Sequence, residues 1–173
     1  LNEKDILSNQ DWTFPTTTYY GPGRLNEIGK FCEEFDIKNP LIVTDSGSKD
    51  LPFIKKLIAL LSKNNIKSDL FYNISPNPRD DEISKGCDQF KNGSHDSIIA
   101  IGGGSAMDGG KSICLTVNSE TPLWDFEFEQ PVPKITKENA FPKIITIPTT
   151  AGTGAETEIT AMVTHLEKGM KFC

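Results

Sequence analysis

The chain has 173 residues, of which 36% are hydrophobic and 24% are charged, and its net charge is −6. This composition provides enough apolar material for a core and too little net charge for intrinsic disorder, and the length fits one domain. The acidic balance disfavours a general nucleic-acid-binding protein, which would carry a basic face.

The sequence also indicates a cellular setting. No apolar run approaches the ~18 residues that a membrane span needs, and the polar residues 1–10 contain no signal-peptide core. The four cysteines are widely spaced and form no C-x-x-C pair, so neither a zinc site nor a redox motif is predicted. We therefore expect a cytoplasmic protein with reduced cysteines and with no nucleic-acid or membrane partner.

Strand and helix patterns alternate along the chain after a polar lead over residues 1–13. Short β-branched or apolar runs predict strands, and apolar residues at helical spacing predict helices between them. Such alternation is typical of an α/β fold with a doubly wound parallel sheet, Rossmann-like, whose strands are covered on both faces. The predicted strands are 14–20, 41–43, 69–73, 98–101 and 144–147, and the predicted helices are 24–35, 51–62, 80–92 and 105–117.

Two later stretches are less regular. Residues 118–143 fit no helix or strand of normal length, and they either cover a surface of the protein or form a solvated excursion. Residues 159–164 and 170–172 are expected to form a closing hairpin around a turn at 167–169.

Polar residues or glycines directly follow four of the predicted strands. They are Asp45, Asn77, the glycines at 102–104 and the segment 148–150. Because the carboxyl ends of parallel strands meet at one edge of the sheet, where ligands of such folds bind, we expect a ligand site there.

The glycine stretch follows the predicted strand 98–101. Three consecutive glycines would allow a phosphate to approach the backbone closely. Ser105 is the expected helix N-cap, with Asp108 in the first turn. Backbone N–H groups and the helix dipole would together favour an anion. The stretch therefore predicts a phosphate cradle, although a strand–glycine–helix junction that binds nothing is the alternative.

Two named phosphate motifs fit only in part. The dinucleotide fingerprint G-x-G-x-x-G needs a third glycine where Met107 stands. The P-loop fits Lys111 and Ser112 but needs a glycine where Ser105 stands, and it would bring the Asp108 carboxylate near the phosphates. A P-loop phosphohydrolase is therefore the weaker interpretation.

A second motif, PTTAGTGAE, occupies residues 148–156. Pro148 ends the predicted strand, and the two glycines free the backbone. Thr149, Thr150 and Thr153 supply hydroxyl groups near the first glycine turn. Local hydrogen bonding within the turn is the alternative role for these threonines.

With both motifs in this order, and with Thr44-Asp45 and Pro76-Asn77-Pro78 before them, the sequence resembles the N-terminal, nucleotide-binding half of the iron-containing (group III) alcohol dehydrogenases. The resemblance covers essentially the whole chain. It implies a dehydroquinate synthase-like N-terminal domain that binds NAD(P) across the carboxyl edge of its sheet.

The resemblance also implies roles for the matched residues. Gly103, Gly104 and Ser105 would hold the pyrophosphate, with Asp108 nearby. Thr149, Thr150 and Thr153 would line the adenine and ribose region. The implied cofactor-binding set is Asp45, Asn77, Gly103, Gly104, Ser105, Asp108, Thr149, Thr150, Thr153 and Lys171.

Three of these residues would contact the nucleoside parts of the cofactor. Asn77 would lie on the adenosine side, and Lys171 matches a lysine that approaches the nicotinamide ribose. Asp45 would accept hydrogen bonds from the adenosine ribose, and its carboxylate would repel a 2′-phosphate. The resemblance therefore favours NAD over NADP as the cofactor.

The family binds its catalytic metal, iron or zinc, through one aspartate and three histidines of a following helical domain. This chain contains only His95 and His165, whereas a catalytic metal site usually needs three protein ligands. We expect residues 1–173 to be the NAD-binding α/β domain, with the helical metal-binding domain absent from this chain. Such a domain alone would not catalyse hydride transfer, and its catalytic residues are not identified.

The expected activity of the intact protein is NAD-dependent, metal-assisted alcohol dehydrogenation of a small alcohol or aldehyde. The expected assembly is a homo-oligomer or a complex with a helical domain. The alternatives are a nucleotide-binding module without catalysis and a relative of glycerol dehydrogenase or dehydroquinate synthase. The PTTAGTG string argues against the synthase.

Overall fold

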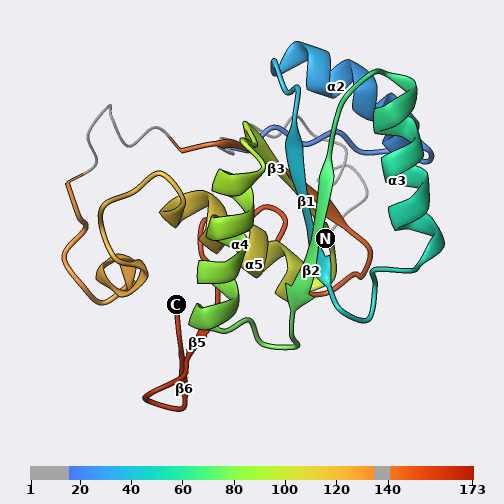
Figure 1. The fold of residues 1–173 in the computed structure, drawn as a ribbon. Helices are drawn as coiled ribbons and strands as arrows, with labels where there is room; N and C mark the ends of the chain where they lie inside the picture. The colour runs from blue at the N-terminus through green and yellow to red at the C-terminus, as the bar shows by residue number, and fades with distance from the viewer. Residues whose placement is uncertain (1–15, 135–140) are drawn as a thin grey trace, which may run out of the picture.

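The computed structural model describes residues 16–134 and 141–173. Within them, a parallel sheet has the strand order β2-β1-β3-β4, with helices on both faces (Figure 1). The strands of this sheet are β1 (Pro40–Asp45), β2 (Asp69–Ile74), β3 (Ser97–Gly102) and β4 (Lys143–Pro148). The predicted doubly wound, Rossmann-like parallel sheet is confirmed.

The helices alternate with the strands as predicted. They are η1 (Arg24–Glu27), α2 (Ile28–Glu34), α3 (Pro52–Lys63), α4 (Asp80–Asn92) and α5 (Gly104–Thr116), followed by the short turn η2 (Leu123–Phe126). The chain continues into a small antiparallel hairpin of β5 (Val163–His165) and β6 (Met170–Phe172). No helix of the described residues is long and apolar enough to cross a membrane.

Successive residues of the central strand β1 supply two separate cores. Leu41 and Val43 pack with residues of α4 and α5, whereas Ile42 packs with residues of α2 and α3. β3 is buried along its whole length, because helices cover both of its faces. The side-chain alternation of a strand thus accounts for the two helical layers.

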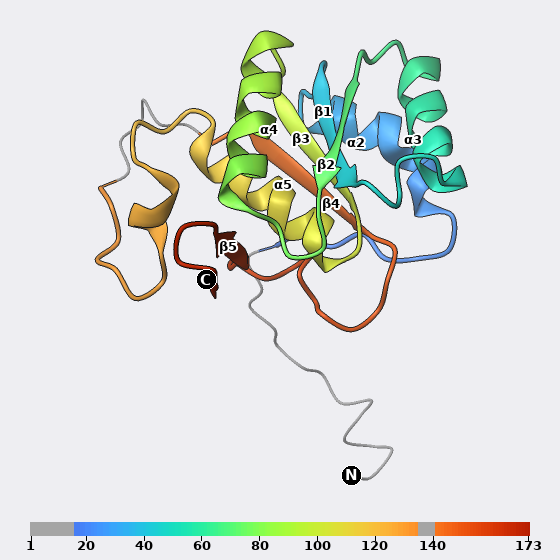
Figure 2. The same ribbon diagram turned by 60° about the horizontal axis from the view of Figure 1, so that its bottom comes forward.

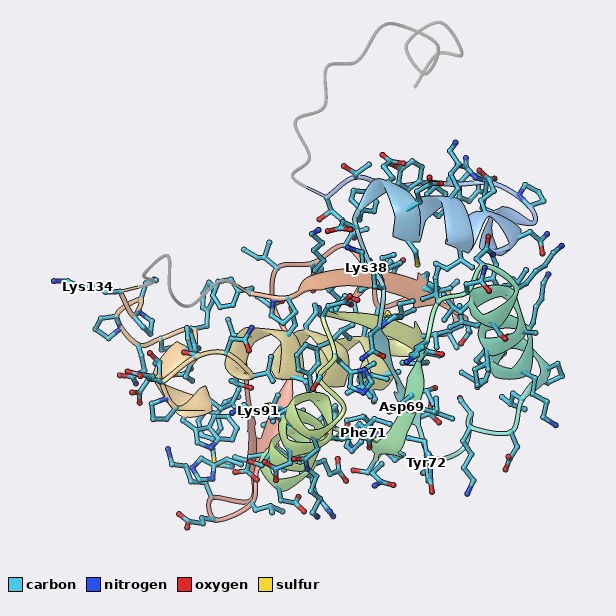
Figure 3. The ribbon with its side chains drawn as sticks, turned by 45° about the horizontal axis from the view of Figure 1, so that its top comes forward. Lys38, Asp69, Phe71, Tyr72, Lys91 and Lys134 are labelled. Carbon is cyan, nitrogen blue, oxygen red and sulfur yellow. The ribbon has the colours of Figure 1, made fainter. Side chains whose placement is uncertain are left out.

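In the edge strand β2, buried and solvent-exposed side chains also alternate. Phe71 is buried in the α4–α5 core, whereas its neighbour Tyr72 is exposed (Figure 3). The Lys49 ammonium lies 4.8 Å from the centroid of the Tyr72 ring.

At the beginning of β2, Asp69 lies 3.4 Å from Nε2 of the buried His95, whose Nδ1 lies 3.0 Å from the Asn39 carbonyl oxygen. His95 therefore has a structural place at the amino edge of the sheet.

Helix α5 lies unusually close to the sheet because two of its residues lack side chains. A Cβ on Gly110 would lie 2.6 Å from the Ala100 Cβ, and one on Gly109 would lie 2.7 Å from the Ile74 Cδ1. In the dinucleotide fingerprint, close helix–strand packing is the task of the third glycine. In this chain Met107 stands at the position of that third glycine, and Gly110 allows the close helix–strand packing instead.

The structure corrects several predicted elements at the start of the chain. Residues 16–20 of the predicted strand 14–20 form no strand, and the rest of it lies outside the described residues. The Tyr19 ring instead stacks on Phe31 of α2, with 4.4 Å between ring centroids. The predicted helix 24–35 is divided into η1 and α2.

Two later elements differ as well. The fifth predicted strand is β4, which is half-buried rather than fully buried, because it pairs only with β3 among the described strands. The predicted strand 159–164 begins only at Val163. Within the irregular stretch, Trp124 covers a surface, since it stacks on His165 at 4.6 Å and donates a hydrogen bond to Asp80. Phe128 and Val132 of the same stretch are exposed.

Candidate functional site

The four strands of the parallel sheet end at one edge, and Figure 2 turns this edge toward the viewer. The turn after β3, the loop after β4 and the β5 hairpin all lie along it (Figure 2). A cavity of about 450 Å³ opens here, within the usual size range of ligand sites. Its lining includes Asn77, Gly104, Ser105, Asp108, Thr153 and Lys171, all of them predicted cofactor-binding residues.

The turn between β3 and α5 requires glycine at its first position. Gly102 has a φ of +146°, and a Cβ there would lie 2.8 Å from the Ala106 Cβ. The Gly102 carbonyl oxygen accepts a hydrogen bond from the Thr149 N–H over 2.9 Å. This bond ties the loop after β4 to the glycine turn, so the two predicted motifs are joined through their backbones.

Helix α5 begins one residue earlier than predicted. Gly103, not Ser105, is the N-cap, because the extended backbone of Gly103 already directs Gly104 into the helix. No side chain caps this end. By helix geometry, the first N–H groups have no partner within the helix, and they carry the positive end of its dipole. The helix therefore presents Gly104, Ser105 and Ala106 as anion donors beside the cavity.

Asp108 does not lie in the first turn of α5, which contains no acidic residue. Its carboxylate is largely buried and lies 3.4 Å from the Lys111 ammonium. Burial raises the pKa of Asp108 above its ordinary value, and the Lys111 charge and a hydrogen bond from the Met162 backbone oppose this shift. Lys111 in turn donates to the carbonyl oxygens of Thr160 and Glu158. Asp108 and Lys111 thus hold the segment 158–162 against α5 as a wall of the cavity.

Asn77 reaches the site from the loop after β2. It adopts a left-handed backbone conformation with a φ of +64°, and its N–H donates to the Ser105 Oγ over 3.3 Å. Because the Ser105 oxygen accepts this bond, the hydroxyl proton remains available to another acceptor. Ser105 can therefore donate to a ligand while it holds the Asn77 loop.

Glu82 organises the same loop, and sequence reasoning did not identify it as a functional residue. Its Oε2 accepts hydrogen bonds from the Ser75 N–H, the Ser75 hydroxyl and the Arg79 N–H at 3.1–3.2 Å. The Glu82 side chain is only 5% exposed. The available signal was its place as the third residue of α4, where a glutamate can bond back to the N-cap backbone.

The loop after β4 faces the glycine turn through two threonines. A Cβ on Gly104 would lie 3.1 Å from the Thr153 Cγ2 and 3.2 Å from its Oγ1, and one on Gly103 would lie 3.5 Å from the Thr150 Oγ1. Thr153 also accepts a hydrogen bond from the Ala155 N–H, so local turn bonding is part of its role. A methyl group on Gly104 would therefore press on Thr153, whereas one on Gly103 would meet Thr150 at ordinary contact distance.

Asp45 lies outside the cavity lining, beside Gly102. Its Oδ2 lies 3.2 Å from the position that a Gly102 Cβ would occupy. Thr149 is exposed and is held near the same turn by its backbone bond to Gly102. The structure therefore places Asp45 and Thr149 at the glycine turn, and Lys171 in the lining of the cavity.

Among the described residues, no three His, Cys, Asp or Glu side chains are placed to hold a metal ion together. His165 stacks on Trp124, and His95 is buried near the amino edge of the sheet. These two histidines do not form a metal site together, and the open N-terminus of α5 beside the cavity is suited to an anionic ligand.

Comparison with known proteins gives consistent matches. The model of the family described as iron-containing alcohol dehydrogenase matches residues 15–173. A choline dehydrogenase of Bacillus subtilis (strain 168) is 32% identical over 174 residues, which cover 99% of this chain and 43% of the relative. The chain thus spans about two fifths of the length of the curated relatives that it matches.

Solved structures agree with the sequence matches. The crystal structure of a 1,3-propanediol oxidoreductase has a TM-score of 0.84 and 29% identity, covering 94% of this chain and 41% of that chain. A sulfoacetaldehyde reductase from Bifidobacterium kashiwanohense, solved in complex with NAD+, has a TM-score of 0.81 and 27% identity, covering 95% and 42%.

Proposed function

Because the chain belongs to the iron-containing alcohol dehydrogenase family, we propose that it is the NAD-binding part of an NAD-dependent, metal-assisted alcohol dehydrogenase. The observation that carries this proposal is the open N-terminus of α5 beside a cavity lined by Asn77, Thr153 and Lys171. A helix N-terminus without a side-chain cap is a ready site for a phosphate group. Two relatives support the choice of cofactor: the sulfoacetaldehyde reductase, whose structure contains NAD+, and an NADH-dependent butanol dehydrogenase of Clostridium acetobutylicum.

The proposed binding mode uses the predicted residues at the carboxyl edge of the sheet. The N–H groups at Gly104 and Ser105 and the Ser105 hydroxyl bind the pyrophosphate of NAD. The adenosine half extends toward Asp45 and the exposed Thr149 and Thr150. The nicotinamide half extends along the cavity past Asp108 and Lys171. The resemblance assigns Thr153 and Asn77 to the adenosine side, and because both also line this cavity, we propose that they lie beside the pyrophosphate, between the two halves of the cofactor.

When bound, NAD supplies the hydride acceptor and donor of the reaction. The residues of this chain hold the dinucleotide and orient it, and the wall at 158–162 covers one side of the cavity. We propose that the metal, iron or zinc, is bound by a helical domain outside residues 1–173, and that residues 1–173 form one NAD-binding domain. This domain alone is expected to be inactive in hydride transfer.

The remaining parts of the proposal concern the whole protein. Its substrate is a small alcohol or aldehyde, its location is cytoplasmic, and it has no nucleic-acid or membrane partner. It works as a homo-oligomer or together with the helical domain.

Titration of the chain with NAD in a calorimeter tests the proposed function. We expect measurable binding to the unchanged chain and a loss of at least about tenfold in affinity for Gly104→Val, because the new side chain enters the space opposite Thr153 and displaces the pyrophosphate. Such a loss corresponds to about 1.4 kcal/mol. Because a Cβ on Gly104 would lie 3.1 Å from the Thr153 Cγ2, a modest loss of stability is also expected, and thermal unfolding of the variant without NAD measures it.

Ala59→Val is the matched control, since Ala59 is exposed on α3 on the other face of the sheet. It should leave NAD affinity unchanged. Equal affinity of the Gly104→Val variant and the unchanged chain for NAD would contradict the proposed binding mode, and no binding to the unchanged chain would contradict the proposed function.

A further inference from the structure

The turn after β1 contains a hydrogen bond that fixes the direction of the Asp45 carboxylate. The Ser48 hydroxyl donates to Asp45 Oδ2 over 2.7 Å. The Ser48 N–H also donates to the Asp45 carbonyl oxygen, over 3.1 Å. The second bond closes a four-residue turn, so the serine hydroxyl is held beside the carboxylate by the backbone itself.

The turn is anchored to the rest of the fold at both ends. The Ser46 N–H donates to the Ile74 carbonyl oxygen of β2 over 3.2 Å, and the Leu51 N–H donates to the Ser48 carbonyl oxygen over 3.0 Å, directly before α3. Within the turn, a Cβ on Gly47 would lie 3.2 Å from Asp45 Oδ1. The serine hydroxyl therefore borders one carboxylate oxygen and the glycine backbone borders the other.

The carboxylate held in this way faces the glycine turn after β3. Its Oδ2 lies 3.2 Å from the position of a Gly102 Cβ. Within residues 16–134 and 141–173, no lysine, arginine or histidine forms an ion pair with Asp45. Its negative charge is therefore not neutralised by an ion pair, and it repels an anion brought to this turn.

We propose that Ser48 is a positioning residue for cofactor discrimination, whose hydroxyl keeps the Asp45 carboxylate directed toward the adenosine ribose of NAD and against the 2′-phosphate of NADP. This inference rests on the proposed function. Asp45 has two single bonds about which its carboxylate could turn toward water, and a charge-assisted hydrogen bond of this length opposes that rotation. Without it, the carboxylate would spend part of its time away from the ribose.

The test compares the dissociation constants of NAD and NADP for three variants with those of the unchanged chain. We expect Ser48→Ala to weaken NAD binding about fivefold and to leave NADP binding unchanged or stronger. The effect is smaller than the full strength of a charge-assisted hydrogen bond, because the freed carboxylate still reaches the ribose part of the time. Ser48→Thr keeps a hydroxyl on the same carbon and should retain the preference of the unchanged chain for NAD over NADP. Ser46→Ala removes an exposed hydroxyl from the same turn and should change neither constant.

A double-mutant cycle separates this role from a general effect on the turn. In an Asp45→Gly background the Ser48 hydroxyl has no carboxylate to hold, so Ser48→Ala should no longer alter the ratio of the two constants. Equal weakening of both cofactors, or the same change in ratio with and without Asp45, would overturn the role of Ser48 alone. Failure of the unchanged chain to bind NAD would overturn the proposed function and this inference with it.

Discussion

Replacement of Asp45 by glycine is expected to lower the preference of the chain for NAD over NADP by at least about tenfold. A unit negative charge beside a phosphate dianion costs on the order of 2 kcal/mol near a protein surface, and about 1.4 kcal/mol corresponds to a factor of ten. Asp45→Gly removes that repulsion and the acceptor for the ribose hydroxyls at the same time. NADP binding should therefore strengthen while NAD binding weakens, as measured by titration with each cofactor.

Asp50→Gly is the control for this prediction, because it removes the same charge from an exposed position five residues further along the chain. A long-range charge effect would act similarly in both variants, whereas the proposed contact is specific to Asp45. An unmutated chain that binds NADP more tightly than NAD would show that the role given to Asp45 is wrong.

Replacement of Glu82 by alanine is expected to lower the free energy of unfolding by about 3 kcal/mol, the scale for removing a buried charged hydrogen-bonding partner. The variant would leave the N–H groups of Ser75 and Arg79 and the Ser75 hydroxyl without their acceptor. The Asn77 loop should then loosen, so NAD affinity should fall together with stability. Chemical denaturation with and without NAD measures both effects.

Asp88→Ala on the exposed face of the same helix is the matched control. It should change the free energy of unfolding by less than about 0.5 kcal/mol, as is usual for surface substitutions. If Glu82→Ala were as stable as this control, the bonds of Glu82 to the loop would have no energetic importance, and its proposed support of Asn77 would be wrong.

The order of strands and helices could be predicted because each buried strand is a short apolar run and each helix has apolar residues at regular spacing. The stretch 14–20 was misread, since a β-branched and aromatic run is also what packs on a helix, as Tyr19 does on Phe31. The partial burial of β4 depends on how many neighbours the strand has, which its own residues do not encode.

The candidate site could likewise be predicted from the sequence only in part. The motifs identified the glycine turn and the threonine loop, and the family model over residues 15–173 confirms the resemblance on which their roles were proposed. The N-cap was misplaced by two residues because the backbone of Gly103, rather than a side chain, starts α5. Glu82 and Ser48 were missed, because each acts through a hydrogen bond to a loop whose path is visible only in three dimensions.

Backbone amide resonances of the isotope-labelled chain, followed during addition of NAD, test the central claim most directly. If the pyrophosphate binds at the start of α5, the amide signals of Gly104, Ser105 and Ala106 should move with NAD concentration, and those of Asn39 and Asp96 at the opposite edge should stay in place. Binding of NAD that leaves the three α5 signals unmoved would contradict the account.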